Sequence, residues 1–363
     1  MNNYRRITVK VGSNVLTRAD GTLDVTRLSS LVDQIASLRA AGIEVILISS
    51  GAVACGRSEL RNIDTRRLDD VDSRQLFSAV GQVKLINRYF DLFRDHNMPV
   101  GQVLTMKESF ATRRHYLNQR NCMLVMLDNG VLPIVNENDT VSVTELMFTD
   151  NDELSGLIAA MMDCDALVIL SNIDGIYDGD PKNPASRVIE AVDPSKDISE
   201  YILTERSGFG RGGMVTKYRI ARKVADEGIE VIIANGKRDN ILLDLILDRD
   251  AGVKATRFLP SPSPVSSLKR WIAHSEGFAK GRILLNANAV EAVTSNHAAS
   301  ILPVGVTAVE GDFERDELVK VIDASTGRQL GVGRVTCNAD EARLAAGHHG
   351  RKPLIHYDYL YIH

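Results

Sequence analysis

The chain alternates short strand-like runs with amphipathic stretches, and this alternation limits its fold more than any other feature. Runs at 6–11 and 43–48 flank a stretch at 25–41 in which apolar residues recur at helical spacing. Gly42 follows that stretch, in the position where a glycine typically ends a helix. Short apolar strands are typical of a parallel sheet that is buried on both faces, so this segment predicts a strand–helix–strand unit.

The same alternation continues along the chain. Further strands are expected at 100–104, 130–135, 166–170 and 229–233. Further helices are expected at 73–95, 113–129, 152–162 and 214–227. Such a succession predicts one large α/β domain, an α/β/α sandwich with a mainly parallel central sheet and right-handed crossovers.

The composition changes at residues 257–270, where Pro260, Pro262 and Pro264 fall within five residues and alternate with serine. A stretch of this kind is typical of a semi-rigid, extended linker. We therefore expect the large α/β domain to occupy residues 1–256, with a Pro/Ser-rich linker at 257–270.

A second, smaller domain is expected over residues 271–357. Short strand-like pieces recur there, separated by turn residues, at 282–285, 304–309, 318–323 and 331–336. The segment is therefore predicted to be β-rich.

Composition and charge exclude several classes of protein. The chain has 363 residues, of which 44% are hydrophobic and 25% charged, so it can bury a core and is not mainly disordered. Lys plus Arg number 43 and Asp plus Glu 47, and a net charge of −4 excludes a binder of polyanions over its whole surface. The four cysteines form no CxxC pair, which excludes a disulfide scaffold and a cysteine zinc site. The polar start and the lack of a long apolar run predict a cytoplasmic protein without a signal peptide or membrane contact.

Ligands of an open parallel sheet bind beyond the carboxyl ends of its strands, so the residues there are the candidate site. Lys10 lies near the end of the first strand, and Gly12 and Ser13 follow that strand, a combination that lets a phosphate approach the backbone beside a positive charge. No Walker A loop is present and no GxGxxG fingerprint follows the first strand, which disfavours a P-loop or dinucleotide fold. Residues 49–52 predict either an ordinary turn with a serine N-cap or an anion site at a helix N-terminus.

Carboxylates and carboxamides are concentrated at 136–139 and 149–152. These residues could cap helices, with Asp150 or Asn151 preceding a helix that begins near Glu153. They could also form an acceptor-rich site for a substrate ammonium group, or order catalytic lysines. The residues alone leave both interpretations open.

A glycine-rich segment at 207–213 is the strongest local signal. Four glycines lie within six residues, directly before a predicted helix that carries Lys217 in its first turn. A flexible loop is the alternative interpretation, but a glycine-rich loop that opens a helix and is followed by a lysine favours the binding of nucleotide phosphates.

Together, these segments resemble the glutamate 5-kinase family, which belongs to the amino-acid kinase superfamily and carries a C-terminal PUA domain. The resemblance covers essentially the whole chain. It rests on the order and spacing of VKVGS at 9–13, SSGAV at 49–53, AVGQ at 79–82, VNEND at 135–139, DNDELS at 150–155, DGIY at 174–177 and GRGGMVTK at 210–217. The resemblance implies phosphorylation of the glutamate side-chain carboxylate by ATP with Mg²⁺, which gives glutamyl 5-phosphate for proline synthesis.

The resemblance also implies roles for individual residues. The catalytic residues would be Lys10 and Lys217, which contact the phosphoryl group, and Asp152, which orders both lysines. The glutamate-binding residues would be Ser50, Gly51, Asp139 and Asn151. The nucleotide-binding residues would be Lys10, Gly12, Ser171, Asn172, Arg211, Gly212, Gly213, Met214 and Lys217. Asn172 and Arg211 depart from the family, which commonly has aspartate and threonine there.

No dedicated metal motif is present, so Mg²⁺ is expected to be held by ATP oxygens and water. The resemblance further implies a homo-oligomer (dimer or tetramer), feedback inhibition by proline and transfer of the product to a reductase. Residues 304–345 carry eight acidic residues and few basic ones, which argues against strong RNA binding and favours a regulatory or structural PUA domain. The alternatives are a kinase for N-acetylglutamate, aspartate or carbamate, and an RNA-binding PUA protein with a kinase-fold scaffold.

Overall fold

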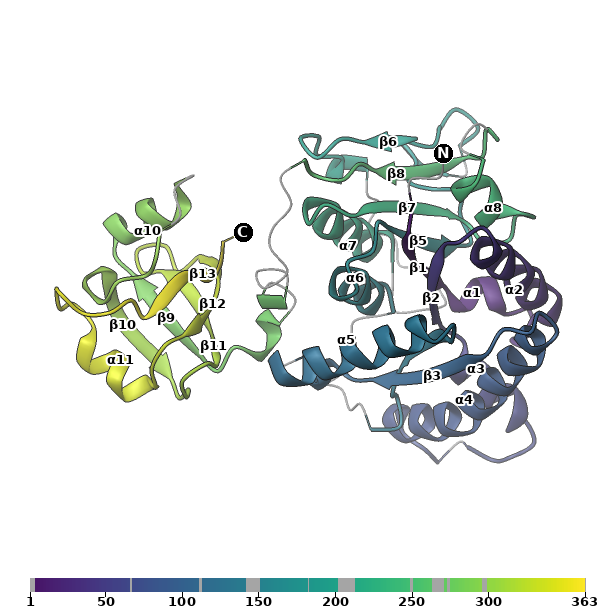
Figure 1. Ribbon diagram of the computed structural model, residues 1–363, viewed down its shortest axis with the longest axis horizontal. Helices are drawn as coiled ribbons and strands as arrows, with labels where there is room; N and C mark the ends of the chain where they lie inside the picture. The colour runs from purple at the N-terminus through teal and green to yellow at the C-terminus, as the bar shows by residue number, and fades with distance from the viewer. Residues whose placement is uncertain are drawn as a thin grey trace. The chain divides into compact units, whose positions relative to one another are not determined.

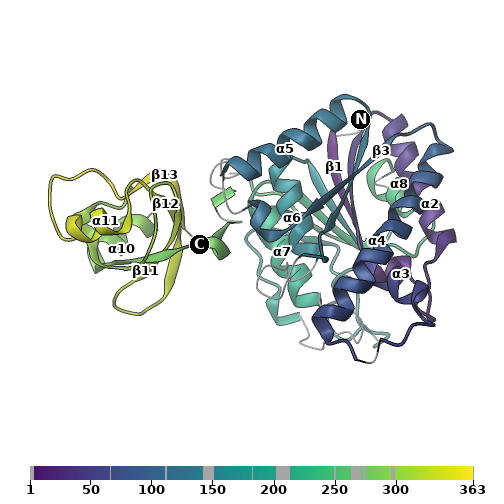
Figure 2. The ribbon, with the colours of Figure 1, turned by 90° about the horizontal axis from the view of Figure 1, so that it is seen from below.

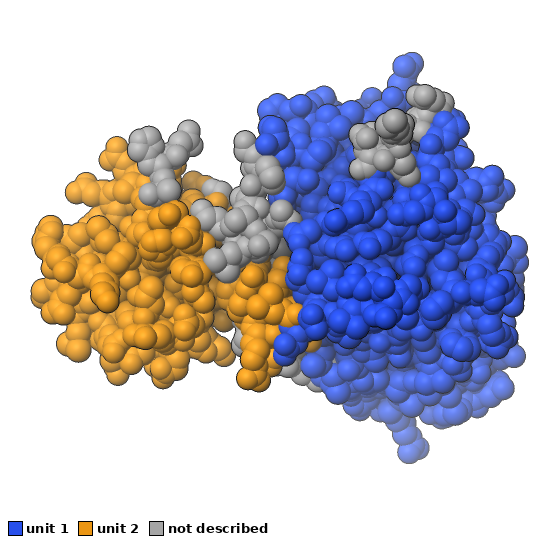
Figure 3. All heavy atoms as spheres, viewed as in Figure 1, with its two compact units in different colours: residues 1–107, 118–264 blue, residues 108–117, 265–363 orange. Residues whose placement is uncertain are grey.

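The structure, a computed structural model, describes residues 4–65, 67–110, 113–141, 151–181, 183–201, 213–248, 251–262, 271–272, 275–295 and 299–362. The chain divides into two compact units, one of residues 1–107 and 118–264 and one of residues 108–117 and 265–363 (Figure 3). The first unit thus ends inside the segment predicted as a linker. The inclusion of 108–117 in the second unit was not predicted.

The first unit is built on an eight-stranded sheet with the order β3-β4-β2-β1-β5-β7-β8-β6. Its strands are β1 (Arg6–Val11), β2 (Glu44–Ser49), β3 (Val100–Thr105), β4 (Leu132–Glu137), β5 (Ala166–Ser171), β6 (Ala191–Val192), β7 (Glu230–Asn235) and β8 (Ala255–Phe258). Neighbouring strands are parallel from β3 to β7, whereas β8 pairs antiparallel with β7. The carboxyl ends of the parallel strands therefore meet at one edge.

Helices cover both faces of this sheet. They are α1 (Ser13–Leu16), α2 (Val25–Ala40), α3 (Ala52–Glu59), α4 (Asp70–Arg94), α5 (Arg113–Asp128), α6 (Asn151–Met161), α7 (Met214–Asp226) and α8 (Ile241–Ile246), with a 3₁₀ turn η2 (Ser199–Tyr201). Most of the 3₁₀ turn η1 (Lys107–Phe110) and the first residues of α5 belong to the second unit. Helices α5, α6 and α7 lie on one face, and α2, α4 and α8 on the other (Figures 1 and 2). This is the predicted α/β/α sandwich with a mainly parallel sheet. No helix in the described part of the chain is long and apolar enough to cross a membrane.

Burial explains why the long elements could be predicted. Every residue of β1, β4 and β5 is buried, so neither face of these strands is exposed to solvent. This burial on both faces is typical of the strands of a parallel sheet. Helix α2 buries Leu28, Leu31 and Ile35 against the sheet, which is the periodic face recognised in the sequence. Gly42 ends that helix at φ +85°, as predicted. The predicted strands and helices of this unit are confirmed to within two or three residues.

Several short elements were not predicted. The helices α1 and α8 and the strands β6 and β8 are too short to show a period in the sequence, whereas a helix after residues 49–52 was expected. The turn before α3 also differs from the expected serine cap: Gly51 is the N-cap residue, at φ +107°, and no side chain caps the helix. A glycine is needed there because side chains rarely tolerate this backbone conformation.

The second unit contains a five-stranded sheet with the order β10-β9-β11-β12-β13. Its elements are η3 (Glu276–Phe278), β9 (Gly281–Leu285), α10 (Ala287–Thr294), η4 (Pro303–Gly305), β10 (Val306–Gly311), β11 (Leu318–Asp323), β12 (Gln329–Val335), α11 (Ala339–Ala345) and β13 (Ile355–Ile362). All pairs are antiparallel except β9 with β11. The predicted β-rich character is correct, although β13 and the two short helices were missed.

Candidate active site

The carboxyl ends of the parallel strands border a cleft of about 1230 Å³ in the first unit. Eleven of the predicted site residues line it: Lys10, Gly12, Ser50, Gly51, Asp139, Asn151, Asp152, Ser171, Asn172, Met214 and Lys217. Gly213 is the N-cap residue of α7 but is not among the lining residues. Arg211 and Gly212 lie outside the described residues. The sheet topology thus brings together residues that are up to 207 positions apart, from Lys10 to Lys217.

Two lysines that line this cleft share one buried carboxylate. Lys10 Nζ lies 2.6 Å from Asp152 Oδ1, and Lys217 Nζ lies 3.0 Å from Asp152 Oδ2. The side chain of Asp152 is essentially inaccessible to solvent, and both lysines are also buried. Each carboxylate oxygen therefore holds one ammonium group, which places two positive charges side by side facing the cleft.

The local folds explain how these three residues meet. Lys10 lies on β1, in the middle of the sheet between β2 and β5. Asp152 and Lys217 lie in the first turns of α6 and α7. Gly156 of α6 allows those helices to pack closely, because a Cβ atom there would lie only 2.9 Å from side-chain atoms of Ile220 and Val224. Close packing of α6 on α7 brings the two helix starts together.

The electrostatics of Asp152 favour the ionised form. Burial alone would raise the pKa of its carboxyl group, but the ammonium groups of Lys10 and Lys217 outweigh burial and lower the pKa to about 2. The carboxylate is therefore charged at physiological pH. Three formal charges, two positive and one negative, leave this end of the cleft with a net positive charge.

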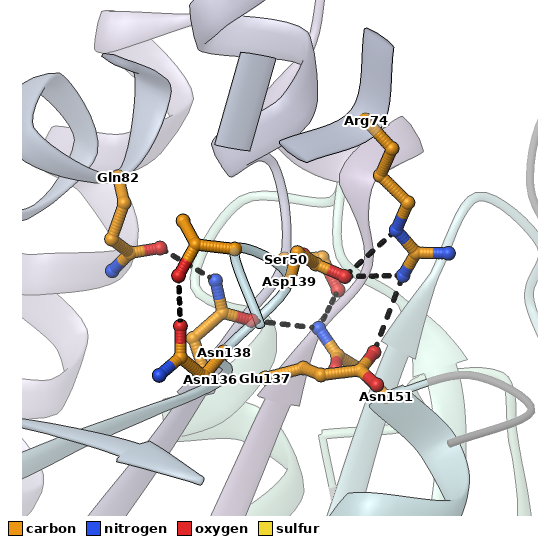
Figure 4. A network of polar contacts seen from close by, with 9 residues as sticks. Ser50, Arg74, Gln82, Asn136, Glu137, Asn138, Asp139 and Asn151 are labelled. Carbon is orange, nitrogen blue, oxygen red and sulfur yellow. Dashed lines mark hydrogen bonds and ion pairs between the residues drawn. The ribbon is translucent and has the colours of Figure 1, made fainter. Parts of the chain in front are cut away.

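A second polar cluster, formed by Glu137, Asp139 and Arg74, lies at another part of the cleft wall. Arg74 Nε donates to Asp139 Oδ1 at 2.8 Å, and Arg74 Nη2 donates to the same oxygen and lies 3.3 Å from Glu137 Oε2 (Figure 4). Both carboxylates are buried, whereas the arginine is partly exposed. Two carboxylates against one guanidinium group leave this cluster with a net negative charge.

A separate chain of amides runs from Gln82 to Ser50 beside this cluster (Figure 4). Asn136 Nδ2 donates to Gln82 Oε1 at 2.8 Å, and Asn136 Oδ1 accepts from Asn151 Nδ2 at 3.1 Å. Asn151 Nδ2 also donates to Ser50 Oγ at 2.8 Å. Asn151 is the first described residue of α6, and Asp150 lies outside the described residues, so the expected capping of this helix stays a prediction. The side chain of Asn151 contacts Ser50 and Asn136.

The residues predicted to bind the nucleotide lie along the other rim. Ser171 ends β5 and, with Asn172, lines the cleft. Gly12 also lines it, but its N–H donates to Leu170 O at 3.1 Å and is therefore not available to a phosphate. Its small size eases the close approach to β5, since a Cβ atom at this position would lie 3.3 Å from Leu170 O. Helix α7 begins after Gly213, which has no side chain to cap the first N–H groups of the helix.

Sequence reasoning missed Arg74 and Gln82, which both lie on α4. Arg74 lines the cleft, and Gln82 lies behind Asn136. Glu137 and Asn136 belonged to the acidic and amide cluster recognised in the sequence, but only Asp139 was selected from it. The only indication of Gln82 in the sequence was that it belongs to the segment AVGQ at 79–82, which is one of the segments that carry the family resemblance.

No group of three or more His, Cys, Asp or Glu side chains that could hold a metal ion occurs among the described residues.

Comparison with known proteins identifies the family. The model of the amino acid kinase family matches residues 5–235, and that of the PUA domain matches residues 281–357. The chain is 66% identical to a glutamate 5-kinase of Bacteroides thetaiotaomicron over 99% of both chains, and 48% identical to one of Chlorobaculum tepidum over 99% of this chain and 98% of the relative. The solved structure of an isopentenyl phosphate kinase shares the fold, with a TM-score of 0.50 and 16% identity over 70% of this chain and 99% of that one. The chain therefore belongs to the glutamate 5-kinases of the amino acid kinase family, with a C-terminal PUA domain.

Proposed function

We propose that the cleft transfers the γ-phosphoryl group of ATP to the side-chain carboxylate of L-glutamate, giving L-glutamyl 5-phosphate and ADP. The observation that carries this proposal is the separation of charge within one cleft. Lys10 and Lys217 form a positive pole around Asp152, and Glu137 and Asp139 form a negative pole with Arg74. The glutamate 5-kinases that resemble the chain over their full length support the same substrate.

The two poles match the charges of free glutamate. Its α-ammonium group fits the acceptors at Asp139 and Asn151, and its side-chain carboxylate then points to the lysines. The α-carboxylate fits the N-terminus of α3, which begins after Ser50 and Gly51 without a side-chain cap. This orientation presents the side-chain carboxylate, and not the α-carboxylate, to ATP.

The chemistry needs no general base, because a carboxylate is already ionised at pH 7. One carboxylate oxygen attacks the γ-phosphorus, a new P–O bond forms, and the bond to the bridging oxygen breaks with its electron pair on ADP. Positioning and charge neutralisation supply most of the catalysis in such transfers. Lys10 and Lys217 would offset the charge that both anions bring together, and Asp152 would hold both ammonium groups in place.

The nucleotide would lie along the rim formed by Ser171, Asn172 and the start of α7. The N–H groups of that helix start suit phosphate oxygens, as do the two lysines. Mg²⁺ bound to ATP would further neutralise the β- and γ-phosphates. Asn172 is neutral where the family commonly has aspartate, so its contact with the nucleotide would be a hydrogen bond and not a charge pair.

Sibling substrates fit the cleft less well. N-acetylglutamate and carbamate have no ammonium group for Asp139 and Asn151. Aspartate has one, but it is one methylene shorter and would not span the two poles in the same way. A pure RNA-binding role would leave the Lys10–Asp152–Lys217 arrangement without a use.

We extend the proposal to partners and regulation. Proline has the ammonium and carboxylate groups of glutamate but no side-chain carboxylate, so it would inhibit by competing with glutamate. The acyl phosphate product is labile, and a reductase would consume it next. We further propose a cytoplasmic homo-oligomer, dimeric or tetrameric, which light scattering would size, and a PUA domain with a regulatory or structural role.

An assay with ATP, Mg²⁺, L-glutamate and hydroxylamine tests the proposed reaction. Hydroxylamine traps the acyl phosphate as a hydroxamate, and we expect its formation to depend on L-glutamate. Absence of hydroxamate with glutamate, but turnover with N-acetylglutamate or aspartate, would overturn the proposal. An RNA shift at physiological salt without kinase activity would favour the RNA-binding alternative.

A further inference from the structure

Gln82 is buried behind the cleft wall and does not line the cleft. It lies on the long helix α4, and 9% of its surface is exposed. Its neighbour Gly81 fixes the helix in place, because α4 approaches α3 so closely there that a Cβ atom on Gly81 would lie 1.8 Å from Ala52 O. The position of Gln82 relative to the end of β4 is therefore tightly defined.

The hydrogen bond from Asn136 to Gln82 couples the polarity of the Asn136 amide to that of the Gln82 amide. Nδ2 donates to Gln82 Oε1, and this leaves Oδ1 to accept from Asn151 Nδ2. If the Asn136 amide alone were reversed, its oxygen would face Gln82 Oε1 and its nitrogen would face Asn151 Nδ2. Asn136 is 3% exposed, so water could not relieve those two repulsive contacts.

This polarity passes on to Asn151, which lines the cleft. Asn151 Nδ2 carries two hydrogens and has two acceptors, Asn136 Oδ1 and Ser50 Oγ. The amide group therefore has only its oxygen, Oδ1, to offer a ligand. An oxygen acceptor suits the α-ammonium group of an amino acid and disfavours an anion at the same place.

We propose that Gln82 is a positioning residue for amino-acid recognition: through Asn136 it holds Asn151 with an acceptor facing the cleft, and this orientation selects a substrate that carries an ammonium group. The inference rests on the proposed function, since it assumes glutamate as the ligand. It concerns a residue that touches neither substrate nor nucleotide and acts only through Asn136 and Asn151. Figure 4 shows the whole path from α4 to Ser50.

The first test compares Gln82→Met with Gln82→Glu. Methionine removes the acceptor and leaves a buried Asn136 donor unsatisfied, and we expect the glutamate KM to rise about tenfold while the ATP KM changes less than about twofold. The Gln82→Glu variant keeps an acceptor on a side chain of the same length, so the glutamate KM of this variant should stay within about threefold of the parent value. If Gln82→Met does not fold, Gln82→Ala carries the same expectation.

Gln34→Met is the matched control. Gln34 is also a buried glutamine, and its Oε1 accepts from Leu242 N at 2.8 Å, but it lies on α2 and does not line the cleft. The Gln34→Met variant should lose about as much stability as Gln82→Met and should keep the glutamate KM of the parent. Equal KM changes in Gln34→Met and Gln82→Met would overturn the inference, because general destabilisation would then explain both.

A double-mutant cycle with Asn151→Ala supplies the deciding measurement. If Gln82 acts through Asn151, adding Gln82→Met to Asn151→Ala should raise the glutamate KM by less than about twofold. Additive effects would overturn the inference. If the parent enzyme forms hydroxamate with glutamate but the cycle is additive, only the role of Gln82 is refuted. If the parent enzyme forms no hydroxamate with glutamate, the proposed function itself is refuted.

Discussion

Lys217 Nζ lies 3.0 Å from Asp152 Oδ2, although the two residues are 65 positions apart and lie on different helices. The contact exists because α6 and α7 begin at the same edge of the sheet and pack through Gly156. Lys10 completes the arrangement from β1 on the other carboxylate oxygen. One buried carboxylate thus orients two cations, and the predictions below follow from this centre and from the acceptor cluster beside it.

Removal of either lysine should affect turnover far more than stability. In Lys10→Ala or Lys217→Ala, Asp152 keeps the other lysine as a partner, so the fold retains a compensated charge. The transferred phosphoryl group loses one of its two cations, and we expect kcat to fall about 100- to 1000-fold. Hydroxamate kinetics and thermal unfolding of each variant measure the two effects. Parallel losses of activity and melting temperature would instead indicate a structural role.

Asp152 should make stability depend on pH in the acid range. Burial opposes its ionisation, but the two lysines lower its pKa from 3.8 to about 2 in the folded chain. The resulting stabilisation is fully present above about pH 4 and is lost as the pH falls through about 2, with a size of roughly 2 kcal/mol. Urea denaturation across this window should show the difference in unfolding free energy between the parent and Asp152→Asn shrinking as the pH falls. A difference that does not change with pH would contradict the ion pairs.

Asp139→Ala should weaken the binding of glutamate and spare that of ATP. Asp139 lies in the negative cluster with Arg74, away from the rim of Ser171 and Asn172. Loss of a charge-assisted contact to an ammonium group should raise the glutamate KM about tenfold or more. Steady-state kinetics with each substrate varied in turn provide the measurement. A larger rise in the ATP KM would contradict the assignment.

Gly81→Ala should disturb both stability and glutamate binding. A methyl group there would lie 1.8 Å from Ala52 O and 2.4 Å from Gly56 N, so α3 and α4 would have to separate. We expect a loss of about 1–3 kcal/mol in unfolding free energy, together with a higher glutamate KM, because α4 carries Gln82 and α3 begins beside Gly51. Ala79→Met, which adds bulk on the exposed side of the same helix, is the control. Unchanged stability and KM in Gly81→Ala would refute the close contact.

The sequence was sufficient for the parts of the structure that local pattern determines. The strands β1 and β5 are uniformly buried, and α2 has a clear apolar face, so both kinds of element could be recognised. The rule that parallel strands present their carboxyl ends to a ligand placed Lys10 and Ser171 at one site before their contacts were known.

The features that escaped prediction depend on contacts between distant residues. Arg74 and Gln82 lie on a helix whose periodicity shows only which side is buried, and their partners Asp139 and Asn136 are 65 and 54 residues away. The start of α3 at Gly51 depends on a left-handed backbone conformation and not on the serine that was expected to cap it. Strand β8, which lies between β7 and the edge strand β6, is too short, at four residues, to show any period.

The central claim is that the side-chain carboxylate of glutamate attacks the γ-phosphorus of ATP in this cleft. L-glutamate labelled with ¹⁸O in its side-chain carboxylate tests it directly, when the product is trapped with hydroxylamine and the released phosphate is observed by ³¹P NMR. Hydroxylamine attacks the carbonyl carbon and leaves the bridging oxygen on phosphorus, so the claim predicts inorganic phosphate that carries one ¹⁸O. Phosphate without ¹⁸O, released while ATP is consumed, would contradict it.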